Sequence, residues 1–433
     1  MSARTTAITL GLLAGLASTP TLAQDAALPD VDSLGLDGPV EEDEQGPVQT
    51  TLIVHARTYS LFTAQRGAAL PDGSTGEVQD AALIVERVRP QLQLKWEGWG
   101  SAELAYDLLP IVGPLGAQAS GFAVQIGNPL RIADLDATLY AGDGSAWALR
   151  QNLDRVVVRL RKPGFEVRVG RQAVGHGSAR IMPSADLFSP FGPATIDTQF
   201  RRGIDGVRVT VPFGEDQEVE AYAFANGTDW AKGAYMARWR ASLPELLDIS
   251  ALAGSSYGRP TVALDLTGTA LGAAWYAEGS LRADLSRWDE TRALRATAGA
   301  EYKLPFGLTT TLEVHYNGLG GEPPFTALFN PVALERQVGE VYFLGTWYAA
   351  LALGYQFHPL GSLSLAHIQS ITDGSALTTV SLGWDFAQEV TIGGGLLLPW
   401  GARPSVDAAG IVSPGSEFGS YPVVGFTDVR LTF

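Results

Sequence analysis

The chain has 433 residues, a formal net charge of −16 and no cysteine. The lack of cysteine excludes disulfides, a lipid-modified cysteine anchor, cysteine-ligated zinc and thiol catalysis. No basic stripe offsets the acidity, so nucleic acid is excluded as a partner.

The first residues, 1–23, have the pattern of a secretory signal peptide. Arg4 gives a positive start, residues 7–17 form an apolar stretch, and Thr21-Leu22-Ala23 is a small-residue cleavage site. The apolar stretch is too short to span a bilayer as a helix. We therefore expect the mature chain to begin near Gln24 and to leave the cytoplasm.

Residues 24–47 form a second segment that differs in composition from the rest. It contains no Lys or Arg and several prolines, which predicts a disordered acidic arm on the periplasmic side. Two roles stay open for it, a solvated linker and a docking arm for a periplasmic partner. Half of the net charge lies here, on Asp25, Asp30, Asp32, Asp37, Glu41, Glu42, Asp43 and Glu44.

From residue 48 onward the chain is a series of alternating segments about as long as membrane β-strands, roughly 9–11 residues. The pattern predicts an all-β fold in one domain, 48–433: a transmembrane antiparallel β-barrel of about 18 strands, with 16 as the alternative. The predicted strands are residues 50–63, 82–97, 99–109, 153–162, 164–174, 203–212, 217–226, 233–243, 247–257, 260–266, 270–282, 292–304, 306–317, 340–357, 360–372, 375–386, 389–400 and 421–433.

The connections between these segments alternate strictly between two lengths. Every second link is a tight turn, as at 163–164 or 358–359, while the intervening links include all the long ones. The long links are 65–80, 110–152, 175–202, 318–339 and 401–420. Outer-membrane barrels have short periplasmic turns and longer extracellular loops, so the parity predicts an outer-membrane barrel with both termini in the periplasm.

One face of the segment 340–357 illustrates the predicted lipid contact. Its apolar positions run from Val341, Phe343 and Gly345 through Trp347 to Phe357, with aromatic residues toward both ends. The same uncharged run could also be a transmembrane helix, although it is short and its neighbours alternate similarly.

The opposite face of each strand is expected to line a polar lumen. On the fourth to eighth predicted strands this face is rich in arginine, which would lower the barrier to anions. Together with Asp186 in the following loop, the predicted lumen and constriction residues are Arg155, Arg159, Arg161, Arg168, Arg171, Arg208, Arg238 and Arg240.

Later strands carry mostly acids on the inner face, so a basic wall would face a more acidic one. An alternative is equally open for each residue: a cross-strand ion pair that stiffens the interior, as between Arg155, Glu166, Arg208 and Glu220. The predicted acidic wall consists of Asp265, Glu278, Glu301, Glu313, Asp385 and Glu389.

The third long loop, 175–202, is apolar and rich in proline, with Met182, Phe188 and Phe191 beside His176 and Asp186. Such a composition is unusual for an exposed loop and predicts that this third extracellular loop folds inward as a constriction. A cap packed on neighbouring loops is the alternative.

Five short motifs stand out in the sequence: Val169-Gly170-Arg171-Gln172, Gly175-His176-Gly177, Asp186-Leu187-Phe188-Ser189-Pro190, Arg202-Gly203-Ile204-Asp205-Gly206 and Ser416-Glu417-Phe418-Gly419. They resemble motifs of alginate-export-type and carbohydrate-porin-like outer-membrane proteins. The resemblance implies a monomeric barrel that passes an anionic or neutral saccharide through an Arg-lined constriction. His176 stands where such proteins often carry an aromatic residue, which puts the substrate in doubt.

The last segment alternates apolar residues up to the end of the printed chain. Val429, Leu431 and Phe433 resemble the terminal signal read by the barrel-assembly machinery of Gram-negative bacteria. We expect this strand to close the barrel against residues 50–63.

No catalytic chemistry emerges from the sequence. The histidines are scattered without metal-ligand spacing, and Gly175–Ala179 is not a nucleophile elbow. We expect no enzyme activity, cofactor or metal, but a channel or exporter for small or polymeric hydrophilic solutes in contact with outer-membrane lipid. A non-conducting docking barrel and, less favoured, an outer-membrane enzyme are the alternatives.

Overall fold

The structure is a computed structural model that describes residues 48–433 with short gaps. The gaps are 77–79, 97, 114–127, 134–136, 142–145, 192–196, 244–245, 286–287, 289–292, 330–334 and 336–337. The predicted signal peptide, 1–23, and acidic arm, 24–47, lie outside the described residues.

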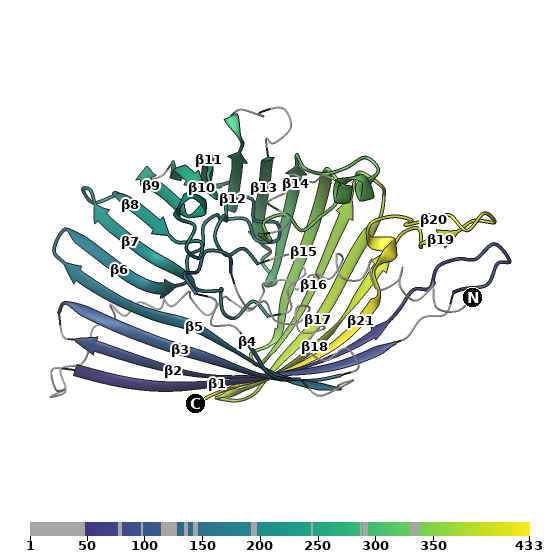
Figure 1. The fold of residues 1–433 in the computed structure, drawn as a ribbon, viewed down its shortest axis with the longest axis horizontal. Helices are drawn as coiled ribbons and strands as arrows, with labels where there is room; N and C mark the ends of the chain where they lie inside the picture. Colours follow the sequence, from purple (N-terminus) through teal and green to yellow (C-terminus); the bar gives the residue numbers. More distant parts are fainter. Residues whose placement is uncertain are drawn as a thin grey trace.

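Eighteen antiparallel strands form a closed barrel (Figure 1). Each strand pairs with its neighbours in chain order, and the short β4 (Ala137–Ala141) pairs only with β5. The barrel strands are β1 (Val48–Ala64), β2 (Ala81–Trp96), β3 (Gly100–Val112), β5 (Trp147–Lys162), β6 (Phe165–Gln172), β7 (Ile204–Pro212), β8 (Gln217–Phe224), β9 (Ala234–Leu243), β10 (Leu247–Ser256), β11 (Arg259–Ala270), β12 (Ala273–Arg282), β13 (Ala293–Lys303), β14 (Leu308–Asn317), β15 (Trp347–His358), β16 (Gly361–Ser370), β17 (Ala376–Ala387), β18 (Val390–Trp400) and β21 (Val423–Thr432).

The barrel closes between its first and last strands, as the sequence predicts. β1 and β21 are antiparallel from His55 opposite Thr432 to Ala64 opposite Val423. Val54 and Phe433 extend this ladder by exchanging backbone hydrogen bonds of 2.9 and 3.0 Å. Closure gives each of the eighteen barrel strands a partner on both sides, which is what a sheet in a lipid environment requires.

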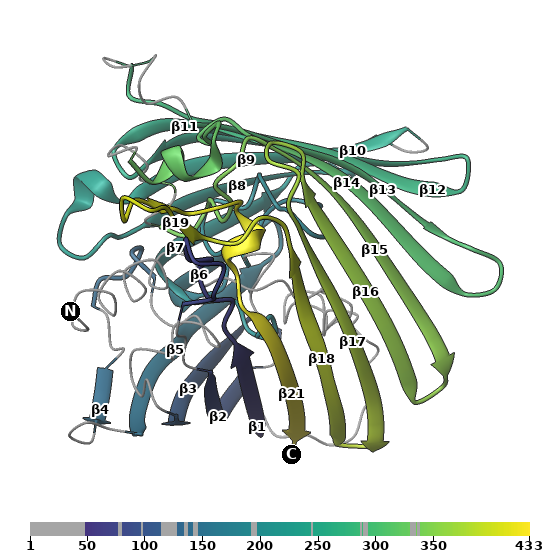
Figure 2. The same cartoon turned by 90° about the vertical axis from the view of Figure 1, so that its right-hand side faces the viewer.

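The short and long connections lie at opposite ends of the barrel, which confirms the predicted parity. Figure 2 shows the C-terminal end of β21 beside the tight turns. Gly164, in the β5–β6 turn, has φ of +89°, a conformation that a residue with a Cβ rarely adopts. At the loop end, a small hairpin of β19 (Ser405–Val406) and β20 (Val412–Ser413) contacts the loop after β1 through Ala69.

The segment 340–357 differs from its prediction at one end. β15 begins only at Trp347, and from there its alternating exposure matches the predicted face. Val341 and Phe343 do not face lipid but are buried in apolar clusters, because the chain before Trp347 folds over the barrel rather than extending the strand. No helix among the described residues is long and apolar enough to cross a membrane.

β5 also differs, since it begins at Trp147 rather than at the predicted residue 153. Its pairing with β3 is irregular between Ala105 and Tyr106, where Arg155 and Leu153 are the successive partners. Asp154 is therefore an extra residue, a β-bulge that changes which side chains of β5 face inward.

Candidate functional site: the charged interior

Burial alternates along the strands and separates the inner face from the outer face. On β12, Tyr276, Glu278, Ser280 and Arg282 are buried, while the residues between them are not. The outer face of the barrel carries exposed apolar side chains such as Leu264 and Val314. The inner face therefore holds most of the charged groups, and it is the candidate functional site.

Three of the arginines predicted on β5 and β6 share a single carboxylate. Arg159 and Arg168 lie 2.7 Å from Glu166, and Arg161 lies 3.1 Å from it. Glu166 is thus a common partner of three guanidinium groups near the turn end of these strands. Arg161 remains about half exposed, with 51% of its side chain accessible.

The arginines predicted on β7 and β9 are more nearly neutralised. Glu220 accepts hydrogen bonds from Arg208 at 2.8 Å and from Arg238 at 3.2 Å, and Arg240 pairs with Glu218 at 2.8 Å. These are the cross-strand ion pairs that the alternative interpretation anticipated. Pairing and solute contact are compatible here, because Arg240 keeps 53% of its side chain exposed.

Two of the predicted arginines occupy buried positions. Arg155 pairs with Asp154, and 9% and 4% of their side chains are exposed. Arg171 falls by strand alternation on the face of Val167 and Val169 rather than on the inner face. It pairs with Asp205 at 2.6 and 2.8 Å, so its role is to join β6 to β7 near their loop ends.

The predicted acids on β12 and β14 bind the backbone of the third loop. Glu278 accepts backbone N–H groups of Ser178 and Ala179 at 2.6 and 2.9 Å, and those of Ser184 and Ala185. Glu313 accepts N–H groups from residues 180, 181 and 182 at 2.6, 2.9 and 2.9 Å. The two carboxylates together therefore satisfy seven backbone donors of one loop.

The other predicted acids have smaller roles. Asp265 accepts a hydrogen bond from the Ser178 hydroxyl, and Glu301 lies 3.6 Å from the Arg180 guanidinium. Asp385 accepts a hydrogen bond from Thr391, and Glu389 lies in the turn between β17 and β18.

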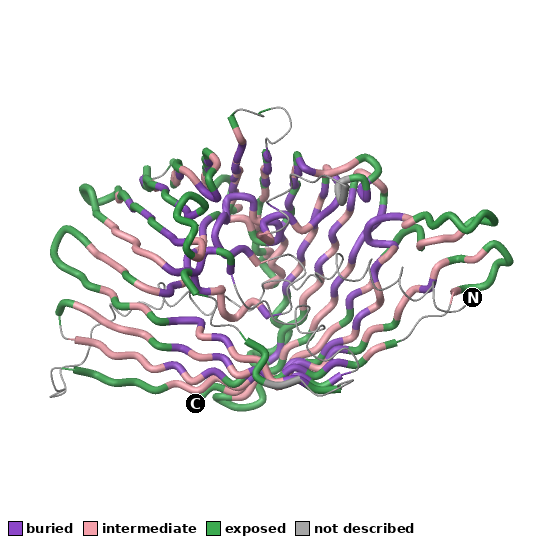
Figure 3. The backbone as a smooth tube through the Cα atoms, in the orientation of Figure 1, coloured by how far each residue is buried: buried purple, intermediate pink, exposed green. Residues whose placement is uncertain are grey.

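The same loop contacts the opposite side of the barrel through its second half. Asp197 binds Arg57 of β1 at 3.0 Å and also pairs with Arg87 of β2. Phe200 lies under Arg89, 4.1 Å from ring centroid to guanidinium carbon. Residues 184–190 between these contacts are all buried (Figure 3).

Asp186, the predicted constriction residue, is fully buried within this loop. It pairs with Arg201, whose side chain also donates to the Ser189 carbonyl at 3.1 Å. Asp186 therefore stabilises the loop internally. Arg201 is the more exposed partner, because 28% of its side chain is accessible to solvent and none of the Asp186 side chain is.

His176 lies in the same loop and is buried between aromatic rings, with centroid distances of 5.3 Å to Phe188 and 5.4 Å to Tyr222. Burial lowers the pKa of His176 well below its usual value, and Arg238 and Arg208 add to the effect. The side chain is therefore neutral at physiological pH and packs as an aromatic group.

A second charged network was missed by the sequence analysis. Arg89 of β2 binds Asp107 at 3.0 Å and Asp154 at 2.9 Å, and Asp428 of β21 binds Arg57 through both carboxylate oxygens at 2.7 Å. The signal was available, because Arg87 and Arg89 flank Val88 on the opposite face of an alternating strand. The network links β1, β2, β3, β5 and β21 below the loops.

Comparison with known proteins rests on structure alone. No family model matches the chain, and no curated protein matches it. The crystal structure of Acinetobacter baumannii OccAB4 superimposes over 91% of this chain and 100% of its own, with a TM-score of 0.53 at 10% identity. OccAB1 from the same organism superimposes with a TM-score of 0.52 at 12% identity. The match covers 90% of this chain and 98% of the OccAB1 chain.

The fold is that of a porin-like barrel. The anion-selective porin from Comamonas acidovorans is less similar, with a TM-score of 0.42 at 14% identity. That match covers 89% of this chain and 100% of the porin chain. The barrel fold shared with OccAB4 and OccAB1 supports the porin-like part of the sequence resemblance, at the level of fold alone. The alginate-export-type family stays a prediction.

Proposed function

We propose that this porin-like barrel is an outer-membrane channel that passes small hydrophilic solutes by passive diffusion, with residues 173–191 and 197–203 folded inward to set the bore. Both termini would lie in the periplasm, at the end of the tight turns. The barrel-assembly machinery would insert the chain through its last strand.

The observation that carries the proposal is the pair of opposite contacts made by this loop. Its first half is bound to Glu278 on β12 and Glu313 on β14, and its second half to Arg57 on β1. In a ring of eighteen strands, β1 and β12 lie far apart around the circumference. A loop held at both places supports a constriction that crosses the interior.

The arginines of β5 and β6 near the tight turns favour anionic solutes. Saccharides that carry carboxylates are one such class of solute. Around Glu166 three arginines, Arg159, Arg161 and Arg168, gather at one carboxylate. Fixed positive charge lining a water-filled bore lowers the barrier for anions. The carboxylates of Glu278 and Glu313 lie on strands that are far from β5 and β6 around the ring, so they oppose this effect less than a neighbouring acid would.

Single-channel recording in planar bilayers tests the proposal. The wild-type chain should conduct and prefer anions in a salt gradient, and R159A with R168A should reduce that preference. Glu166→Gln should increase it, because it removes the one compensating negative charge. The absence of conductance would overturn the channel, and an unchanged preference in both variants would overturn the role of these arginines.

A second candidate is a non-conducting docking barrel, which one observation favours. Inner-face residues of β1, β2, β3 and β15–β18 form a buried apolar cluster with Ile181 and Met182 of the third loop. Such a cluster fills part of the loop end of the interior. Conductance near zero in the wild type, restored by deleting residues 178–185, would support this candidate over the channel.

A further inference from the structure

The acidic arm, residues 24–47, is the part of the sequence to which the channel assigns no role. It carries eight acidic residues and no Lys or Arg. It joins the barrel at Val48, which pairs with Trp96 beside the tight turn between β2 and β3. The arm is therefore attached at the turn end of the barrel, the same end at which three arginines gather around Glu166.

A row of basic side chains begins beside this junction. Directly paired residues of neighbouring antiparallel strands point to the same face of the sheet. From the second described residue the pairing leads across six strands without meeting an acid at any paired position. Arginines that lie directly opposite one another repel, so the far end of the row favours additional negative charge. The row consists of Gln49 of β1, Lys95 of β2, Ser101 of β3, Arg159 of β5, Arg168 of β6 and Arg208 of β7.

The carboxylates that pair with these arginines are less exposed than the arginines themselves. Arg161 keeps 51% of its side chain exposed, against 12% for Glu166. Arg208 keeps 15%, against 0% for Glu220. The same order holds for the other ion pairs of these two carboxylates. A chain that enters the lumen from the turn end therefore meets mainly cationic groups on this wall.

The spacing of the acids matches the length of the row. Neighbouring strands lie about 4.8 Å apart, so the three arginines of the row are about 14, 19 and 24 Å from β1. An extended chain spans about 3.3–3.6 Å per residue, so Glu44 and Glu41, four and seven residues before Val48, can reach about 13 and 24 Å from it. The four consecutive acids 41–44 can thus extend along the three arginines.

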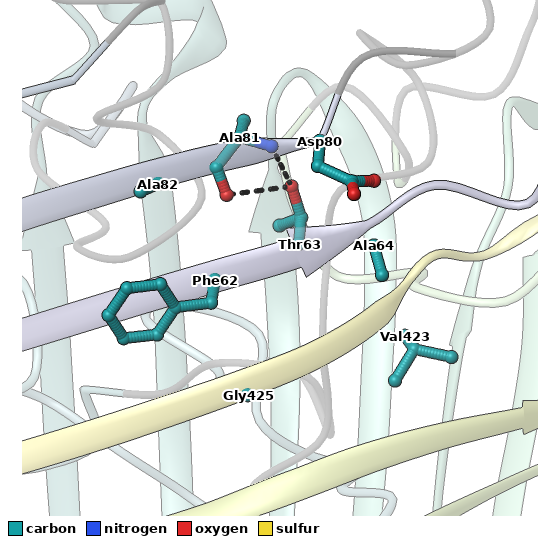
Figure 4. A pocket seen from close by; sticks show the side chains of 8 residues that line it. All are labelled: Phe62, Thr63, Ala64, Asp80, Ala81, Ala82, Val423 and Gly425. Atoms are coloured by element: carbon teal, nitrogen blue, oxygen red, sulfur yellow. Dashed lines mark hydrogen bonds between the residues drawn. The ribbon is translucent and has the colours of Figure 1, made fainter. Parts of the chain in front are cut away.

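A hollow at the other end of β1 does not suit the arm. It has a volume of about 370 Å³ and is lined mostly by apolar and small residues, such as Phe62 and Ala82 (Figure 4). Among the described residues that line it, only Asp80 is charged, and that charge would repel the arm. Phe62 is also 14 residues along β1 from Val48, a distance of about 46 Å.

We propose that the acidic arm binds along the row from Lys95 to Arg208 and partly fills the mouth of the channel, where it competes with anionic solutes for the same arginines. The inference rests on the proposed channel function and adds a regulation to it. Because salt screens the attraction, the arm is held at low ionic strength and released at high ionic strength. This role differs from that of a solvated linker and from that of a docking arm for a separate periplasmic protein.

Neutralising the acids nearest the junction tests the proposal in the full chain. In planar bilayers at 0.1 M salt, the time-averaged conductance of E41Q with E42Q, D43N and E44Q should be roughly twofold or more above that of the wild type, with a stronger anion preference. The difference should vanish at 1 M salt, where the screening length falls from about 10 to about 3 Å. The matched control removes four charges farther from Val48, D25N with D30N, D32N and D37N, and should give a smaller rise.

Two results of this measurement would overturn the docking and leave the channel intact. One is an unchanged conductance in the variant that lacks the acids 41–44, and the other is an equal rise in the control. Conductance that is absent from every variant would instead overturn the channel, and the position of the arm is then decided by cross-linking alone.

Cysteine cross-linking locates the arm without a conductance measurement, since the chain has no cysteine of its own. E42C with S101C, oxidised in outer membranes, should give an internal disulfide that mass spectrometry of the linked peptides detects. E42C with T309C is the matched control, because Thr309 also lies one residue inside the start of its strand, on the distant β14. Its yield should be several times lower. Equal yields at the two positions would indicate a solvated linker, and no yield at Ser101 would indicate an arm that binds elsewhere; either result would overturn the proposal.

Discussion

At the scale of single residues, two carboxylates accept the most backbone hydrogen bonds from the third loop, and among the described residues neither of them forms an ion pair with a guanidinium group. Glu278 and Glu313 are 5% and 2% exposed, and each is held by backbone N–H groups of the third loop. Hydrogen bonds to a charged acceptor contribute about 1.5–3 kcal/mol each, and a buried donor left without a partner costs about 1–3 kcal/mol. The position of the loop therefore depends on these two acceptors.

Replacing Glu313 with Gln should release the loop. The amide keeps the size of the carboxylate but has only one oxygen, so at least one of the three N–H groups from residues 180–182 loses its acceptor. We expect a larger and noisier single-channel conductance and faster proteolysis within the loop. The matched control is Glu301→Gln, since Glu301 contacts only the side chains of Arg180 and Thr311.

Period-two alternation placed Glu278 and Glu313 on the inner face, but it could not identify their partners. The donors are 93 to 133 residues away in sequence and belong to a loop without periodicity. The same limit applies to Arg171: the alternation of β6 puts it with Val169, and only the contact with Asp205 shows where its charge is satisfied.

At the scale of elements, three loops meet at one buried carboxyl group, that of Glu417. It accepts hydrogen bonds from the N–H of Leu344 at 2.8 Å and from the Tyr348 hydroxyl at 2.5 Å, while its own N–H donates to Asp373 at 2.7 Å. Burial, together with a smaller effect of the Asp373 charge, raises the pKa of Glu417 from 4.5 to about 7, against the hydrogen bonds that its carboxylate accepts.

This raised pKa predicts a pH dependence of the loop contact. The folded state holds the proton more tightly than the open state, so the contact is most stable at acidic pH and weakens as pH rises from 4.5 to about 7. The total effect is roughly 3 kcal/mol. Thermal unfolding should therefore show a midpoint that falls between pH 5 and pH 8. Glu417→Gln should reduce this pH dependence of the unfolding midpoint. Asp407→Asn, in the exposed hairpin, should leave it unchanged.

The start of β15 shows why element boundaries are harder to predict than element existence. Val341 and Phe343 continue the apolar alternation of the strand. The structure instead buries Phe343 against Tyr348 and Phe418, with ring centroids at 4.4 and 5.8 Å. Burial in a loop cluster and exposure to lipid both favour apolar residues, so the pattern alone cannot separate them.

At the scale of the whole molecule, the barrel depends on the seam between β1 and β21. Asp428 binds Arg57 across this seam with two hydrogen bonds of 2.7 Å, and Arg430 donates to the same carboxylate at 2.8 Å. Breaking a buried ion pair by removing one partner costs about 3–5 kcal/mol, because the remaining charge stays buried.

Asp428→Asn should therefore destabilise closure more than the loss of any exposed acid. We expect a lower denaturant midpoint and a lower temperature for the gel-migration change that marks barrel opening. Asp385→Asn, an exposed acid near a turn, is the control and should behave like the wild type. Equal midpoints for the two variants would contradict a role for the seam pair.

The global architecture was the most predictable level. All eighteen predicted segments correspond to barrel strands, because strand alternation and loop parity repeat along the whole chain and errors at one boundary do not spread. The charged interior was predicted only in part. Which arginines are neutralised depends on register, and the bulge at Asp154 and the loop residue Asp197 fall outside any repeating pattern.

The third loop has one more consequence, which is mechanical. A barrel wall is a single layer of strands, and such a tube flattens easily, because bending between neighbouring ribbons costs little. A segment fastened to β1 and β2 on one side and to β12 and β14 on the other acts as a cross-brace. The ellipticity of the opening is then determined by the length of this brace rather than by the wall, so shortening the brace would change which solutes fit without altering a single strand.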